Sequence, residues 1–372
     1  ARVELSSDGG VDFFLDTPYQ NLALLLDIPI VKASEVTVDN PLGTGPYSLE
    51  DGIGGKHLQR VVGWWCSSDD LVAKDSSIAL VEAESPSQIR DEFEFSGLSV
   101  VCTNPQTDSY ADYRCDFELW EVDSGFMMYI GCNVTYSKFF DDGTPRTFLT
   151  YGIDRQTLVD DNYGGLALPT TLPISPMSPY YSKSLAANYD YDEMRFIDAA
   201  SKFRVPTNDK GVPRTLQLLV NSDDSARLRC ARNIAATLTE LGLACETVES
   251  PTSVYEARLQ AANYDIYLGI TKLPTTADLS EFYRPWGEMS WGGLANETIY
   301  NMVNQSLADR GNYYNLHKLV ADDGRIIPVM AGYYAIYAKR GVLSDLNPAR
   351  DNVFYYTLGK TMESSKVATQ FS

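Results

Sequence analysis

The segment 214–270 restricts the fold more than any other part of the chain, because its pattern alternates between strand and helix. Residues 216–220 are mostly apolar, as in a buried strand, and Ser222 then offers an N-cap for a helix that ends at Gly242. A strand, a helix and a strand follow at residues 243–248, 254–262 and 264–270. This order predicts an α/β lobe with a parallel sheet and right-handed crossovers, and such sheets bind ligands at the carboxyl ends of their strands.

The 372 residues are too many for one ordinary core and predict two lobes. Outside the α/β segment, β-rich stretches are expected at residues 11–15, 53–65, 117–136 and 326–339. Helices are expected at residues 146–163, 297–308 and 312–319, and an irregular proline-rich loop at residues 169–179.

The formal net charge of −20 disfavours binding to nucleic acid or to an anionic membrane surface, because both partners are themselves negative. The apolar runs all fall short of the roughly 18 residues that a membrane span needs. The six cysteines and two histidines lack the spacing of metal ligands, so neither a metal nor a cofactor is predicted. A Cys230–Cys245 disulfide would close a 15-residue loop and stabilise the fold by about 3 kcal/mol, with buried free thiols as the alternative.

Catalysis finds little support in the sequence. His57 and His317 lack the setting of a catalytic triad, and His317 is expected on a helix surface. Neighbouring carboxylates are common, but adjacent residues do not face each other across a substrate; they are expected at caps and turns, at Asp141–Asp142, Asp160–Asp161, Asp223–Asp224 and Asp322–Asp323. The chain is therefore predicted not to be an enzyme, with a hydrolase using an unrecognised acid pair as an alternative.

Four short motifs occur in an order that resembles a known family. They are the Gly-Thr-Gly-Pro-Tyr loop at 43–47, the Ile-Asp-Arg triplet at 153–155, the glycine- and proline-rich stretch that begins at Gly164, and the Tyr-Asp pair at 189–190 before a helix. Taken together, they resemble the family 5 extracellular solute-binding proteins, the receptors for oligopeptides, dipeptides and nickel. The resemblance extends over residues 11–341 or so.

The resemblance implies a two-lobed clamp of the periplasmic-binding-protein type (type II), whose lobes are joined by two crossing strands. It places the crossings near residues 128–136 and 329–337. The first lobe would comprise residues 1–137 and 338–372, and the second, α/β lobe residues 138–337. Family members carry a further segment before the equivalent of Arg2, so the first lobe is expected to be incomplete.

The function that the resemblance implies is capture of a peptide or peptide-like solute and its delivery to the membrane permease of an ABC importer. The protein would be a monomer outside the cytoplasm, either periplasmic or held at the cell surface by a lipid anchor outside this chain. Two alternatives stay open: an effector-sensing domain of a regulator with the same fold, and a receptor for an oligosaccharide or a metal chelate.

Aromatic residues make up 12% of the chain, and tyrosine and tryptophan suit a cleft that encloses a polar ligand. The candidates lie at the expected crossings or near the ends of second-lobe strands: Tyr129, Asn133, Tyr136, Thr271, Lys272, Arg284, Trp286, Trp291, Tyr333 and Tyr334. Among these, Lys272 or Arg284 would meet a ligand carboxylate. Peptide-binding members carry an aspartate for the peptide amine after the strand that ends here at Ile270, whereas Asp278 is displaced from that position and is not assigned the role.

Overall fold

The computed structural model describes residues 2–26, 28, 30–39, 41–52, 54–66, 76–83, 85–95, 97–103, 113–141, 143–342, 348 and 350. The chain divides into two compact units. Unit 1 comprises Ala1–Leu26 and Gly125–Gly332, and unit 2 comprises Asp27–Ser124 and Tyr333–Ser372. The chain passes from one unit to the other after residues 124 and 332, and the crossings were expected near residues 128–136 and 329–337. Residues 1–26, which were expected in the first lobe, belong to the unit that contains the α/β segment. Most of the expected return of the chain beyond Lys339 lies outside the described residues.

The parallel sheet predicted for the α/β unit is confirmed. Strand β9 (Leu216–Asn221) pairs in parallel with β10 (Cys245–Ser250) on one side and with β11 (Ile266–Lys272) on the other. The crossovers are α6 (Ser225–Glu240) and α7 (Thr252–Gln260). Unit 1 is therefore an α/β structure, as the alternation of strand and helix indicated.

Helix α6 begins later than expected, because the chain still turns at Ser222. The Ser222 N–H donates to the Ser250 carbonyl (2.8 Å), and the Asp223 N–H donates to the Asn221 side chain (2.9 Å). Asp224 is the N-cap instead, and its carboxylate accepts a hydrogen bond from the Arg227 N–H (3.0 Å).

Two long strands belong to both units. Strand β7 (Phe117–Cys132) enters unit 1 at Gly125 and pairs antiparallel with β11. Strand β12 (Ile326–Lys339) leaves unit 1 after Gly332, and its unit 1 part pairs antiparallel with β8 (Ala167–Pro169). The sheet order is β10-β9-β11-β7-β12-β6, with β8 also on β12. Pro169 ends a strand here, although the sequence suggested an irregular loop from this residue onward.

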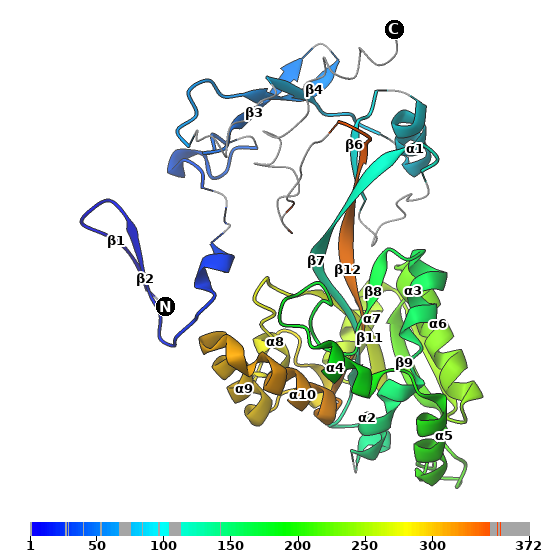
Figure 1. Cartoon of the computed structure of the whole chain (residues 1–372). Coiled ribbons are helices and arrows are strands. Elements are labelled where there is room, and N and C mark those ends of the chain that lie inside the picture. Colours follow the sequence, from blue (N-terminus) through cyan, green and yellow to red (C-terminus); the bar gives the residue numbers. More distant parts are fainter. Residues whose placement is uncertain are drawn as a thin grey trace. The chain divides into compact units, whose positions relative to one another are not determined.

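Helices lie on both sides of the unit 1 part of the sheet (Figure 1), and the buried apolar residues form two clusters. Along each strand alternate residues face opposite sides, so Leu218 and Val220 lie in one cluster and Leu219 in the other. The first cluster is completed by α2 (Thr144–Phe148), α3 (Arg155–Tyr163), α5 (Glu193–Lys202) and α6. The second is completed by α7, α8 (Ser280–Tyr283), α9 (Glu297–Ala308) and α10 (Tyr313–Asp323), and the short α4 (Lys183–Ala186) packs in a smaller cluster.

Tyrosines and glycines interlock between β7 and β11. Tyr267 lies opposite Gly131, and Tyr129 lies opposite Gly269. A Cβ atom added to Gly131 would approach the Tyr267 ring to 2.2 Å, and one added to Gly269 would approach the Tyr129 ring to 2.6 Å. The rings of both tyrosines therefore occupy space that only glycine leaves open.

The amino-terminal part of unit 1 consists of a hairpin (residues 2–14) and a short strap (residues 15–26). Strands β1 (Arg2–Leu5) and β2 (Val11–Phe14) pair antiparallel and are exposed. In the strap that follows, the Gln20 N–H donates to the Leu307 carbonyl of α9 (2.8 Å), and the Tyr19 hydroxyl hydrogen-bonds the Thr276 hydroxyl (2.9 Å).

In unit 2, β3 (Tyr47–Gly52), β4 (Gly55–Arg60) and β5 (Ser77–Ala79) form an antiparallel sheet. The loop before β3 is a structural turn, since the Thr44 carbonyl accepts hydrogen bonds from the indoles of Trp64 (2.8 Å) and Trp65 (2.9 Å). Unit 2 also contains helix α1 (Pro86–Phe95) and strand β6 (Val100–Thr103).

The predicted Cys230–Cys245 disulfide is absent from the structure, in which both cysteines are free. Cys230 lies in the first cluster on α6, and Cys245 packs against the same cluster from β10. Burial raises the pKa of both thiols to about 12. Cys230 thus acts as a small apolar side chain of the core.

Candidate functional site

The parallel strands of unit 1 end together at one edge of the sheet, called here the carboxyl edge. It is defined by the last residues of β9, β10 and β11, which are Asn221, Ser250 and Lys272. Because β11 pairs antiparallel with β7, Lys272 lies opposite Phe126, and the first unit 1 residues of β7 join the same edge. Open α/β sheets bind ligands at this edge, which makes it the candidate binding site of unit 1.

Side chains of the protein itself occupy the helix N-termini at the carboxyl edge. Asp223 accepts hydrogen bonds from the Thr252 N–H (2.9 Å) and hydroxyl (2.8 Å) at the start of α7, and these bonds lower the pKa of its carboxyl group. Asp224 caps α6 and forms an ion pair with Arg227 (3.3 Å). Both positive ends of helix dipoles are thus already neutralised by carboxylates.

Lys272 supplies a cation at this edge. It is exposed at the end of β11, with its Nζ 5.9 Å from the centre of the Phe126 ring, and the neighbouring Thr271 is half-buried. A ligand carboxylate at the carboxyl edge would therefore meet the Lys272 ammonium group.

Tyr129 lies in the core beneath this edge. It is 1% exposed, its hydroxyl accepts a hydrogen bond from the Tyr267 hydroxyl (3.3 Å), and its ring meets Phe282 edge-on at 5.1 Å. Burial raises its pKa far above the ordinary value of tyrosine.

Asn133, Tyr136 and Trp291 lie at the opposite edge, where β11 begins. The Asn133 side chain is fully buried and donates to the carbonyls of Ala262 and Tyr264 (both 2.8 Å). Its oxygen accepts from the N–H groups of Thr135 and Tyr136, so all four hydrogen-bonding positions of this amide serve the chain itself. Six residue steps along β11 separate this edge from Lys272, or about 20 Å.

The remaining candidates are also dispersed. Arg284 forms a two-pronged ion pair with Glu281 (3.0 and 2.8 Å), which lowers the pKa of that carboxyl group. Trp286 is 95% exposed and has a left-handed backbone (φ 61°). Tyr333 and Tyr334 belong to unit 2, where Tyr333 is 5% exposed. Of the ten predicted residues, only Thr271 and Lys272 lie together at the carboxyl edge with exposed or half-buried side chains, and the ligand role of all ten stays a prediction.

Asp278 lies just before the short helix α8, whose N-cap is Leu279, and its carboxylate accepts a hydrogen bond from the Ser280 N–H (2.8 Å). The preceding Ala277 has a left-handed backbone (φ 51°), and the loop continues into the Thr276 contact with Tyr19. The carboxylate therefore has a structural task in unit 1.

His317 is not on the helix surface, and that expectation was wrong. Its side chain is fully buried in α10, and burial lowers its pKa to about 4. Neither ring nitrogen has a hydrogen-bond partner among the described residues. The histidine is neutral at physiological pH and packs as part of the core.

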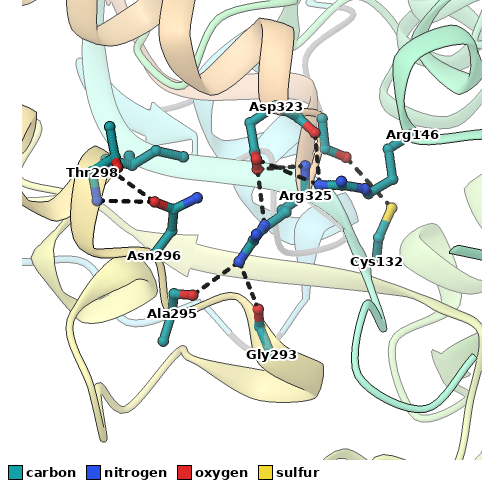
Figure 2. A network of polar contacts seen from close by, with 10 residues as sticks. Cys132, Arg146, Gly293, Ala295, Asn296, Thr298, Asp323 and Arg325 are labelled. Atoms are coloured by element: carbon teal, nitrogen blue, oxygen red, sulfur yellow. Dashed lines mark hydrogen bonds and ion pairs between the residues drawn. The ribbon is translucent and has the colours of Figure 1, made fainter. Parts of the chain in front are cut away.

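A polar network that no local sequence pattern indicated links segments at the opposite edge (Figure 2). Arg325 donates to the carbonyls of Gly293 (3.0 Å) and Ala295 (2.9 Å) and forms an ion pair with Asp323 (3.2 Å). Arg146 forms a second ion pair with Asp323 (3.4 Å). The network joins α2, the start of β12 and the loop before α9, and its role is to hold these three segments together.

Within the described residues, no helix combines the length and the apolarity needed to cross a membrane. The described side chains also contain no group of three or more histidines, cysteines or carboxylates placed to hold a metal ion.

Several solved structures share this fold. An ABC transporter substrate-binding protein, CtaP from Listeria monocytogenes, has a TM-score of 0.74 at 16% identity, covering 97% of this chain and 77% of its own. NikA from Brucella suis, in complex with Fe(III)-EDTA, has a TM-score of 0.73 at 16% identity, covering 98% and 79%. The oligopeptide-binding protein AppA from Bacillus subtilis, in complex with a nonapeptide, has a TM-score of 0.63 at 17% identity, covering 97% and 78%.

In sequence, no curated protein matches the chain. The model of the bacterial extracellular solute-binding proteins, family 5 Middle, matches residues 3–293, which is most of its length. The chain therefore belongs to the family 5 extracellular solute-binding proteins, the binding components of ABC importers.

Proposed function

We propose that this protein captures a peptide or peptide-like solute outside the cytoplasm and delivers it to the membrane permease of an ABC importer. The family match over residues 3–293 carries the proposal. Family members work outside the cytoplasm as binding proteins and not as enzymes. A monomer, free in the periplasm or held at the cell surface by a lipid anchor, is the form in which we propose it acts.

The ligands of similar proteins are varied. They include a nonapeptide for AppA from B. subtilis, Fe(III)-EDTA for NikA from B. suis and agropinic acid for AgaA from A. tumefaciens R10. Peptides are the first candidates for this chain, and metal chelates and oligosaccharides are the alternatives. The carboxyl edge carries the Lys272 cation, and the Asp278 carboxylate accepts a hydrogen bond from the Ser280 N–H at the start of α8. We therefore propose that the carboxylate of the ligand, and not a free α-amine at Asp278, is recognised by unit 1.

A double-mutant cycle between ligand and protein tests this proposal. Short peptides with a free or an amidated carboxyl terminus are titrated by calorimetry into the wild-type protein and into Lys272→Gln. We expect amidation to weaken binding to the wild type about fivefold, the value of an exposed ion pair, and to have no effect on the variant. N-terminal acetylation should leave both affinities unchanged.

The matched control is Lys202→Gln, since Lys202 pairs with Asp198 on the outer surface of α5. Amidation must weaken binding to this variant as it does to the wild type. Equal affinity of wild type for the acid and amide forms would remove Lys272 from the site but leave the importer function intact. Binding of Fe(III)-EDTA or an oligosaccharide without any peptide would show that the solute is not a peptide.

A further inference from the structure

Unit 1 contains a cavity of about 270 Å³ that lies away from the carboxyl edge. Its walls are the start of α3 (residues 154–156), the end of β8 with the loop after it (169–171), and Tyr181, Asp190 and Tyr191. Helix α3 and β8 lie side by side (Figure 1). The cavity adjoins β12. In the sheet, β7 and β11 lie between β12 and β9, whose last residue belongs to the carboxyl edge. It is therefore a different site from the proposed solute site.

Two hydrogen-bond donors of the cavity wall, Arg155 and Thr171, are already used within the chain. The buried Arg155 guanidinium donates to the carbonyls of Pro328 (2.9 Å), Thr150 (3.1 Å) and Ile153 (3.3 Å) and to the Thr150 hydroxyl (2.8 Å). The Thr171 hydroxyl donates to the Ala186 carbonyl (2.9 Å). These bonds hold the wall in place and leave it with few donors for a ligand.

Hydrogen-bond acceptors in the cavity wall, by contrast, remain available to a ligand. Among the described residues, no donor forms a hydrogen bond with the Asp190 carboxylate, which lies in an exposed position on the wall. The Asp154 carboxylate caps α3, and each of its oxygens accepts one bond from Thr157 (3.2 and 2.8 Å), which leaves lone pairs over. With Arg155 counted, the lining has a formal charge of −1. A ligand that fits must bring donors and positive charge.

Aromatic rings supply the rest of the lining. Tyr181 is half-buried beside Thr170 and Thr171, which hydrogen-bond its hydroxyl, and Tyr191 is 38% exposed. The face of a tyrosine ring attracts a cation, particularly one that is weakly hydrated. An acidic group next to two aromatic rings is thus suited to an organic ammonium ion.

We propose that this cavity binds a small organic cation, with the ammonium group between the Asp190 carboxylate and the rings of Tyr181 and Tyr191. Its volume admits a molecule of the size of choline. Occupation of the cavity would be independent of the transported solute, because none of the carboxyl-edge residues contributes to the wall.

The test compares choline with its neutral isostere 3,3-dimethylbutan-1-ol, titrated into the whole protein and followed by NMR at the backbone amides of Gln156, Thr171 and Tyr191. We expect choline to bind with millimolar affinity and to shift these signals, and the neutral isostere to leave them in place. Asp190→Asn should weaken choline binding about fivefold or more. Asp209→Asn, which changes an exposed turn of the same unit, should have no effect.

Any of three results with choline would overturn the proposal. They are equal shifts with choline and its isostere, unchanged choline affinity in Asp190→Asn, and the absence of any binding with choline. Glycerol or glucose binding that depends on Asp190 would also overturn it, since the site would then be one for polyols. Choline affinity in Lys272→Gln separates the two sites: we expect it to equal that of the wild type, whatever the solute titrations show.

Discussion

His317 shows how the surroundings of one residue set the charge that it can carry. A buried imidazole without hydrogen-bond partners is stable only in its neutral form, since a buried unpaired charge is costly. Its position was readable in principle: Tyr313, Leu316, His317 and Val320 follow the i, i+3, i+4, i+7 spacing of one helix face, and all four are buried. Histidine as a residue type favours the surface, whereas the spacing favours the core, and the surface expectation followed the residue type.

The pKa of His317 predicts a loss of stability in mild acid. In the unfolded chain the histidine binds a proton near its ordinary pKa of 6.5, whereas the folded protein resists protonation down to about 4. Its contribution is complete above pH 6.5 and is lost as the pH falls from 6.5 toward 4. The difference between the two pKa values corresponds to about 3 kcal/mol in the free energy of unfolding.

Urea unfolding of the wild type and His317→Leu at pH 7 and pH 4.5 measures this contribution. Between the two pH values the wild type should lose about 2–3 kcal/mol more than the variant. His57→Gln, a change on strand β4 of unit 2, should lose as much as the wild type. Equal losses in wild type and His317→Leu would show that the histidine is protonated in the folded state.

At the scale of elements, the sequence predicted most where periodicity and punctuation agree. The β9–α6–β10–α7–β11 order is confirmed because buried strands alternate with helices that have clear ends, as at Gly242 after α6. The start of α6 was misplaced by two residues, since both Ser222 and Asp224 are good N-caps and only the Ser222–Ser250 backbone bond decides between them. Strand β8 was missed because its identity comes from pairing with β12, which no local pattern reveals.

Substitutions at the two competing caps test the observed start of α6. Asp224→Ala should lower the free energy of unfolding by about 1–2 kcal/mol, because the Arg227 N–H loses its acceptor and the ion pair is lost. Asp224→Asn keeps the cap and should lower it by less. Ser222→Ala should change it by about 0.5 kcal/mol at most. Thermal or urea unfolding gives the order, and a larger effect of Ser222→Ala would restore the start expected from the sequence.

At the scale of the whole molecule, the family and its fold could be predicted, but the grouping of site residues could not. The motifs around residues 43–47 and 153–155 are local and lie in family order, so one chain is enough to recognise them. Whether the ten candidate residues group at one site depends on which edge of the sheet each loop reaches, and packing decides that. Asn133 and Lys272 both lie next to strand ends, yet they belong to opposite edges of unit 1.

Free cysteines are expected throughout the folded chain. All six are thiols in the structure, distributed over both units. Alkylation of the unfolded protein without reductant, followed by mass spectrometry, should therefore modify all six. In the folded protein Cys132 and Cys230 should resist, because they are buried and their pKa is raised to about 12. A linked pair of peptides containing Cys230 and Cys245 would contradict the structure.

The interlocked strands β7 and β11 have a consequence for how the chain can change over evolutionary time. Each strand carries the same triplet, Tyr-x-Gly, at residues 129–131 and 267–269, and the antiparallel pairing sets each ring against the glycine of the other strand. A shift of two residues would place ring against ring in one direction and glycine against glycine in the other, so the triplets favour one register by volume. A larger side chain at either glycine is tolerated only if the ring opposite becomes smaller. We therefore expect these four positions to be kept together in related proteins, and to change together where they change.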